Sequence, residues 1–245
     1  MCPMPAALPH GELREVLPDV FFVTGTVEMR TPIAIRFSRN MTIFREEGRL
    51  VLVNSVRLDE AGLAKLDALG KVTDVIRLAG FHGMDDPFYK DRYGATVSAV
   101  RGQRYTSGLD PNAAKTYFTP DVELSADSKL PLRGARLHLF DSTPPEALLV
   151  LERQGGIVVS GDALQNWDQP DEFFSTIGKV MMRVMGFIKA CNVGPAWLKQ
   201  AKPAPERLRG VLELPFENVL PAHGRPVLGG AREKFRPAIE RAAAR

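Results

Sequence analysis

The stretch from Val72 to Tyr93 constrains the fold more than any other part of the chain. Its apolar run from Val75 to Leu78 predicts a short buried strand. The loop that follows has the sequence Gly80-Phe81-His82-Gly83-Met84-Asp85-Asp86-Pro87, and its proline predicts the first turn of a helix. α/β proteins place reactive groups at strand ends of this kind. We therefore expect an α/β fold with a candidate site in this loop.

Turn signals and hydrophobic periodicity predict the other elements. A strand is expected at Val20 to Val27, and a hairpin at Met41 to Asn54 around Glu46-Glu47-Gly48. Leucines spaced three apart from Asp59 to Leu69 predict a helix that Gly70 ends. Further strands are expected at 95–100, 122–124, 136–140, 147–152, 157–160 and 218–220, a loop at 165–172, and helices at 176–190, 205–212 and 231–245.

These elements predict one domain, residues 1–245, with residues 1–17 as an extended N-terminal segment. Two sheets with outer helices are the simplest arrangement of so many strands. The sequence is 44% hydrophobic and 25% charged with a net charge of +3, which is typical of a soluble globular protein. There is no dense basic block to bind nucleic acid and no apolar stretch long enough to span a membrane. Two cysteines form no framework, and we expect a cytoplasmic protein.

Two later strand ends also carry polar residues. Val158 to Asp162 ends in Gly-Asp, and Val219 to Gly224 contains Ala222-His223-Gly224. With the loop at His82, this order of elements resembles the metallo-β-lactamase fold. That family has an H-x-H-x-D-H loop after a strand, then a further His, a Gly-Asp element, and a final His before Gly. The resemblance spans most of the chain from Val20 and implies a four-layer αββα sandwich of two mixed β-sheets with outer helices.

The resemblance is closest to a divergent branch in which the metal-binding motif is eroded. Aligning His82 with the first family His places Met84 and Pro87 where two other histidines belong, and Ser142 where the later His belongs. A shift of one residue would place Asp85 rather than Asp86 in the acid position. The family ligands that remain on this alignment are His82, Asp86, Asp162 and His223.

A centre of two zinc ions needs more ligands than these four supply, because each catalytic zinc takes about three protein ligands. Two imidazoles and two carboxylates suit a single zinc, iron or manganese ion. His82 is then a ligand or an acid/base partner, and Asp86 is the second candidate catalytic residue. Against this, His82 can be merely hydrogen-bonded, Asp85 and Asp86 can serve the start of a helix, and Asp162 can form a turn.

Two functions follow from this reading of the sequence. The first is a single-metal hydrolase that acts on a small molecule of unknown class. The alternative is a non-catalytic binding or assembly scaffold that has lost the dinuclear zinc centre, with one metal ion or none. The Met-rich helix (176–190) contains Met181, Met182 and Met185. Its apolar side predicts core packing, a homodimer contact or a lid over the pocket. Trp167 is expected to line the same pocket.

Overall fold

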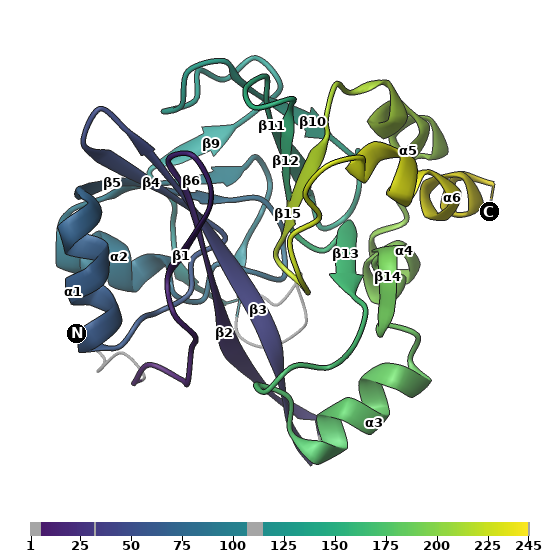
Figure 1. The fold of residues 1–245 in the computed structure, drawn as a ribbon, viewed down its shortest axis with the longest axis horizontal. Helices are drawn as coiled ribbons and strands as arrows, with labels where there is room; N and C mark the ends of the chain where they lie inside the picture. The colour runs from purple at the N-terminus through teal and green to yellow at the C-terminus, as the bar shows by residue number, and fades with distance from the viewer. Residues whose placement is uncertain (1–5, 32, 107–114, 245) are drawn as a thin grey trace.

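The structure, a computed structural model, describes residues 6–31, 33–106 and 115–244. Two β-sheets face each other at its centre, with α1 and α2 outside one sheet and α4 to α6 outside the other (Figure 1). This is the αββα sandwich predicted from the sequence.

The first sheet is mixed and has seven strands in the order β1-β2-β3-β4-β5-β6-β9. Neighbours from β1 to β4 are antiparallel, and those from β4 to β9 are parallel. Its strands are β1 (Arg14–Leu17), β2 (Val20–Thr31), β3 (Ile33–Glu46), β4 (Arg49–Val53), β5 (Lys71–Arg77), β6 (Thr96–Val100) and β9 (Val122–Leu124).

The second sheet has the order β10-β11-β12-β15 and is also mixed, because β12 and β15 run parallel. Its strands are β10 (Ala135–Leu139), β11 (Ala147–Leu151), β12 (Ile157–Ser160) and β15 (Asn218–Pro221). Two small sheets accompany them. They pair β7 (Tyr105–Thr106) with β8 (Thr116–Phe118), and β13 (Leu164–Trp167) with β14 (Lys189–Val193).

Local sequence signals explain where the helices begin and end. The Asp59 side chain accepts from the Gly62 N–H and caps α1 (Glu60–Leu69), and Pro87 lies in the first turn of α2 (Asp86–Tyr93). The Ser175 side chain caps α3 (Thr176–Val184). The remaining helices are α4 (Pro195–Ala201), α5 (Pro205–Gly210), the 3₁₀ turn η1 (Val211–Glu213) and α6 (Ala231–Ala243). Among the described residues, no helix has the length and apolar character needed to cross a bilayer.

Three apolar clusters hold the four layers together. Phe22 and Ile76 of the first sheet meet Leu149 of the second in the middle cluster. Leu63 of α1 packs on the outer face of the first sheet, and Phe235 of α6 on the outer face of the second. Because both sheets are covered on both faces, their strands are nearly continuous apolar runs. The runs end at one edge of the sandwich, where polar loops begin.

The sequence prediction was wrong at two segments. The loop expected at 165–172 begins instead with β13, whose polar Gln165 and Asn166 are buried. The Met-rich helix was expected to continue to about residue 190, but α3 ends at Val184. Gly186 then adopts a φ of +78°, and β14 follows. A glycine in the left-handed region ends a helix despite an apolar pattern that continues beyond it.

Helix α3 has one packed face and one exposed face. Met182 packs with Phe37 and Trp167 against the long β2–β3 hairpin. On the other side Ile177, Val180 and Val184 form an apolar stripe, and Val184 is 83% exposed. The homodimer contact predicted for this helix stays a prediction, and the stripe is the surface that it would use.

Candidate metal site

Three strand ends meet at the polar edge of the sandwich. His82 lies in the loop after β5, Asp162 in the turn after β12, and His223 in the bend after β15, two residues beyond Pro221. Because β12 and β15 are parallel, with Ser160 opposite Pro221, their ends open at the same edge of the second sheet. One ligand atom from each of His82, Asp162 and His223 lies within 4.8 Å of the others.

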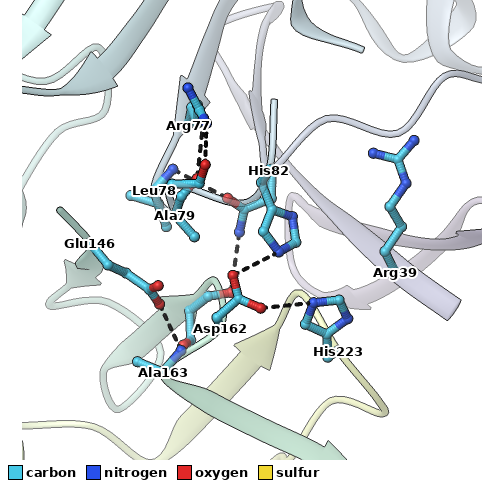
Figure 2. Close-up of polar contacts among 12 residues, drawn as sticks. Arg39, Arg77, Leu78, Ala79, His82, Glu146, Asp162, Ala163 and His223 are labelled. Carbon is cyan, nitrogen blue, oxygen red and sulfur yellow. Dashed lines mark hydrogen bonds and ion pairs between the residues drawn. The ribbon is translucent and has the colours of Figure 1, made fainter. Parts of the chain in front are cut away.

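The Asp162 carboxylate lies between the two imidazoles (Figure 2). His82 Nε2 is 3.4 Å from Asp162 Oδ2, and His223 Nε2 is 3.2 Å from Oδ1. The centroids of the two imidazole rings are 5.0 Å apart. All three side chains are largely buried, because His82 is 7% exposed, His223 is 5% exposed, and the Asp162 side chain is 13% exposed. The three form a compact group from three distant parts of the chain.

Strand β3 holds the loop that carries His223. Asn40 Nδ2 donates to the carbonyl oxygens of Pro221, at 2.9 Å, and Gly224, at 2.6 Å. His223 Nδ1 lies 3.2 Å from the Ser38 carbonyl oxygen. Gly224 has a φ of +89°, and a Cβ there would lie 2.0 Å from the Asn166 carbonyl oxygen, so only glycine fits this tight turn.

Hydrogen bonds from Arg77 fix the backbone of the loop that carries His82. The His82 N–H donates to the Ala79 carbonyl oxygen at 3.1 Å. Arg77, whose side chain is buried, donates to that same oxygen from Nε, at 3.1 Å, and to the Gly80 carbonyl oxygen from its terminal nitrogen. These carbonyl groups have no strand partner after β5 ends, and the guanidinium satisfies them.

The aromatic side chains of Trp167 and Phe37 pack beside the His223 ring. The ring centroid of Trp167 is 4.8 Å from that of His223, and the ring of Phe37 is 6.2 Å away. Trp167 Nε1 donates to Ser38 Oγ at 3.0 Å, which fixes the indole in place. The expectation that Trp167 lies against the site is met. Such a wall excludes water and strengthens electrostatic interactions within the group.

Burial and mutual charge set the protonation of the group. Burial lowers the pKa of His82, and the attraction of Asp162 only partly opposes this, so the imidazole is held neutral. Burial alone would raise the pKa of Asp162, but the two imidazoles outweigh it and hold the pKa below its ordinary value. A neutral imidazole beside an ionised carboxylate is the protonation state that binds a metal ion.

Asp86 does not belong to this group. Its side chain is fully buried, and the carboxylate accepts from Ser55 Oγ and from the Tyr105 hydroxyl, both at 2.5 Å. Burial raises the pKa of Asp86, while these two hydrogen bonds and the charge of Arg77 oppose the rise. The helix that Asp86 begins turns its carboxylate into the core, so the structure brings together only three of the four residues predicted as ligands.

Asp85, the other acid that the alignment allowed, also lies outside the group. Its carboxylate forms an ion pair with the buried Arg39 and accepts from the Arg57 N–H at 2.6 Å. The three residues that replace family histidines contribute no ligand to the group either. Met84 is 45% exposed, Pro87 lies in the first turn of α2, and Ser142 Oγ donates to the Pro144 carbonyl oxygen at 2.9 Å.

The contacts of His223 and Asp162 fit a metal ion. A carbonyl oxygen only accepts hydrogen bonds, so an imidazole of His223 that carries a single proton and donates to Ser38 has that proton on Nδ1. Its Nε2 then presents a lone pair to Asp162 Oδ1, which a cation between the two would satisfy. Asp162 Oδ2 is buried, and among the described residues it makes no regular hydrogen bond, only the 3.4 Å contact with His82 Nε2. A buried carboxylate that lies between two imidazole nitrogens is a donor set that suits a metal ion.

Comparison with solved structures identifies the fold as that of the metallo-β-lactamases. The FIM-1 metallo-β-lactamase of Pseudomonas aeruginosa, in its mono-zinc form, is 14% identical with a TM-score of 0.60, over 99% of this chain and 100% of that one. The metallo-β-lactamase of Erythrobacter litoralis is 14% identical with a TM-score of 0.57, over 98% and 94%. That of Hirschia baltica is 17% identical with a TM-score of 0.56, over 95% and 96%. No family model and no curated sequence matches the chain.

Two buried residues that support the site carried no signal in the sequence. Asn54 Nδ2 donates to the Ser160 carbonyl oxygen at 3.2 Å, and its Oδ1 accepts from the Leu78 N–H at 3.3 Å, so it joins the ends of β12 and β5. Glu146 Oε1 accepts from the Ala163 N–H at 2.6 Å. Neither residue lies in a motif, and only the meeting of the two sheets reveals them.

Proposed function

We propose that the chain binds one metal ion through His82, Asp162 and His223 and uses it to hydrolyse a small molecule. The observation that carries the proposal is the convergence of three donor side chains from separate loops to within 4.8 Å. Packing alone does not require two imidazoles to face one buried carboxylate. A site with two His and one carboxylate leaves coordination positions open, as catalytic sites do.

Zinc, iron and manganese all suit these donors. A bound ion of this kind supplies Lewis-acid chemistry to the bond that is hydrolysed. The chain supplies the rest. The Asp162 carboxylate offsets the charge of the ion, Ser38 orients the imidazole of His223, and Trp167 excludes water from one side. FIM-1, which shares the fold, has been crystallised in a mono-zinc form, so one ion is compatible with this architecture.

Metal content tests the proposal first. Protein purified without chelator, stripped and then reconstituted should hold about one equivalent of zinc, iron or manganese per chain. Saturation at 100 times the dissociation constant adds about 2.7 kcal/mol, so Tm should rise by about 5 to 10 °C. Elemental analysis and thermal denaturation measure both. Less than about a tenth of an equivalent of each metal, unchanged on reconstitution, would contradict the site.

A matched pair of histidine variants separates the site from general effects of mutation. His223→Ala should lose the metal and the rise in Tm. His138→Ala should keep both, because His138 lies in β10 and its Nε2 contacts the Arg207 carbonyl oxygen, at 2.8 Å.

Hydrolysis is tested by assaying the metal-loaded protein against a panel of lactams, thioesters, phosphodiesters and lactones. Turnover that survives both chelation and His223→Ala would show that this site is not responsible.

A non-catalytic scaffold is the second candidate. It is favoured by Met84, Pro87 and Ser142, which contribute no ligand where the family has histidines. The scaffold predicts that His223→Ala changes neither ligand binding nor thermal stability, with or without added metal. A loss of stability that appears only in the metal-loaded protein would argue against the scaffold and for the metal site.

A further inference from the structure

Glu146 lies where the two sheets meet beneath the candidate site. It directly precedes β11 and is 1% exposed. Its backbone forms an isolated bridge with Ala79, and the next residue, Ala147, donates its N–H to the Leu78 carbonyl oxygen at 3.1 Å. The His82 N–H in turn donates to the Ala79 carbonyl oxygen. The backbone of Glu146 therefore fixes the strand end from which the His82 loop begins.

The side chain of Glu146 reaches the other strand end. Its Oε1 accepts from the Ala163 N–H at 2.6 Å, within the turn that carries Asp162 (Figure 2). That turn also packs against the end of β5. A Cβ on Gly161 would lie 2.3 Å from the Ala79 Cβ and 3.2 Å from Glu146 Oε1. Glu146, Ala79 and the Gly161 to Ala163 turn are thus in mutual contact, with no room for a side chain at Gly161.

The second carboxyl oxygen of Glu146 has no evident structural use. Oε2 is buried and has no hydrogen-bond partner among the described residues. A buried polar atom without a partner destabilises the folded chain, and an apolar side chain of similar size would fill the same space at no such cost. A residue retained only for packing would not need the carboxyl group. Its carboxyl group accepts from the backbone of the turn that carries a predicted metal ligand.

We propose that Glu146 is a positioning residue that sets the distance between His82 and Asp162, and so determines the affinity of the site for metal. It does not belong to the three-residue group itself. Supporting residues of this kind typically change metal affinity by about 10- to 100-fold when replaced. The inference rests on the proposed metal site, because positioning has a function only if these side chains bind an ion together.

Variants of Glu146 test the role. Glu146→Leu fills the space but accepts no hydrogen bond, whereas Glu146→Gln keeps an acceptor oxygen. We expect Glu146→Leu to weaken zinc binding by about 10- to 100-fold and Glu146→Gln by less than about threefold. Zinc affinity is measured by competition with a chromophoric chelator. The control is Glu46→Leu, a buried glutamate of the remote β3–β4 hairpin that accepts from Arg133 Nε at 3.1 Å and should affect only stability.

A second readout needs no metal. In the metal-free protein, the NMR signals of the His82 and His223 rings should shift in Glu146→Leu and stay in place in Glu46→Leu. If the leucine variant does not fold, the more flexible Glu146→Met takes its place. Zinc affinity within twofold of wild type, or unshifted histidine signals, would overturn the positioning role and leave the metal site standing. A wild-type chain that takes up no zinc would overturn both.

Discussion

Replacing Asp162 with alanine should abolish most metal binding while the chain stays folded. Asp162 is the only carboxylate of the group, and both imidazoles point their Nε2 atoms at it. Without it, two imidazoles and no carboxylate remain to hold a divalent ion. Structural zinc sites with four ligands bind with about 10 to 16 kcal/mol, so losing one charged ligand should cost on the order of 100- to 1000-fold in affinity.

Competition titration of zinc measures this loss, and Asp168→Ala is the matched control. Asp168 lies six residues further along the same segment, and its exposed carboxylate pairs with Arg225 at 3.4 Å. This variant should bind zinc like the wild type. Unchanged affinity in Asp162→Ala, or an equal loss in Asp168→Ala, would remove Asp162 from the ligand set.

Replacing Asp86 with alanine should have the opposite pattern, with a large loss of stability and little effect on metal. The change leaves the hydroxyls of Ser55 and Tyr105 buried without an acceptor. It also removes the carboxyl group near Arg77, whose guanidinium lies 4.1 Å from the Tyr105 ring centroid. With about 1 to 3 kcal/mol for each unsatisfied group, we expect the free energy of unfolding to fall by about 3 to 5 kcal/mol.

Denaturant unfolding of the metal-free protein measures this difference, with Asp67→Ala as control. Asp67 also accepts from a tyrosine hydroxyl, that of Tyr93 at 2.8 Å, but on the exposed surface. Its replacement should change stability by less than about 1 kcal/mol. Zinc affinity in Asp86→Ala should stay within about threefold of wild type. A folded Asp86→Ala protein that no longer binds zinc would instead place Asp86 among the ligands, as the sequence alignment suggested.

Local patterns predicted most of the fold. The leucine spacing between Asp59 and Leu69, Gly70 as a stop and Glu46-Glu47-Gly48 as a turn each act over a few residues, and the structure confirms the helix and the hairpin that they predict. The αββα arrangement was predicted because strand order and the polar strand ends together matched one known fold. The polar loops after β5, β12 and β15 were predicted from where apolar runs end, which is also a local property.

The sequence could not predict contacts that depend on the meeting of distant segments. Asp86 has the spacing of a family ligand, but its orientation is set by Ser55 and Tyr105, which lie 31 and 19 residues away in the chain. Gln165 was predicted to lie in a loop because its side chain is polar, although it lies buried in strand β13. Glu146 lay in no motif, and its contact with Ala163 exists only because the start of β11 lies beside the end of the antiparallel strand β12.

Zinc-edge anomalous diffraction from zinc-soaked crystals tests the central claim most directly. The account predicts one anomalous peak per chain at the polar edge, within about 2.3 Å of His82 Nε2, His223 Nε2 and an oxygen of Asp162. The Asp86 carboxylate should still accept a hydrogen bond from the Tyr105 hydroxyl. No peak at these three residues, or a pair of peaks about 3.5 to 4 Å apart with Asp86 as a ligand, would contradict the single-ion site.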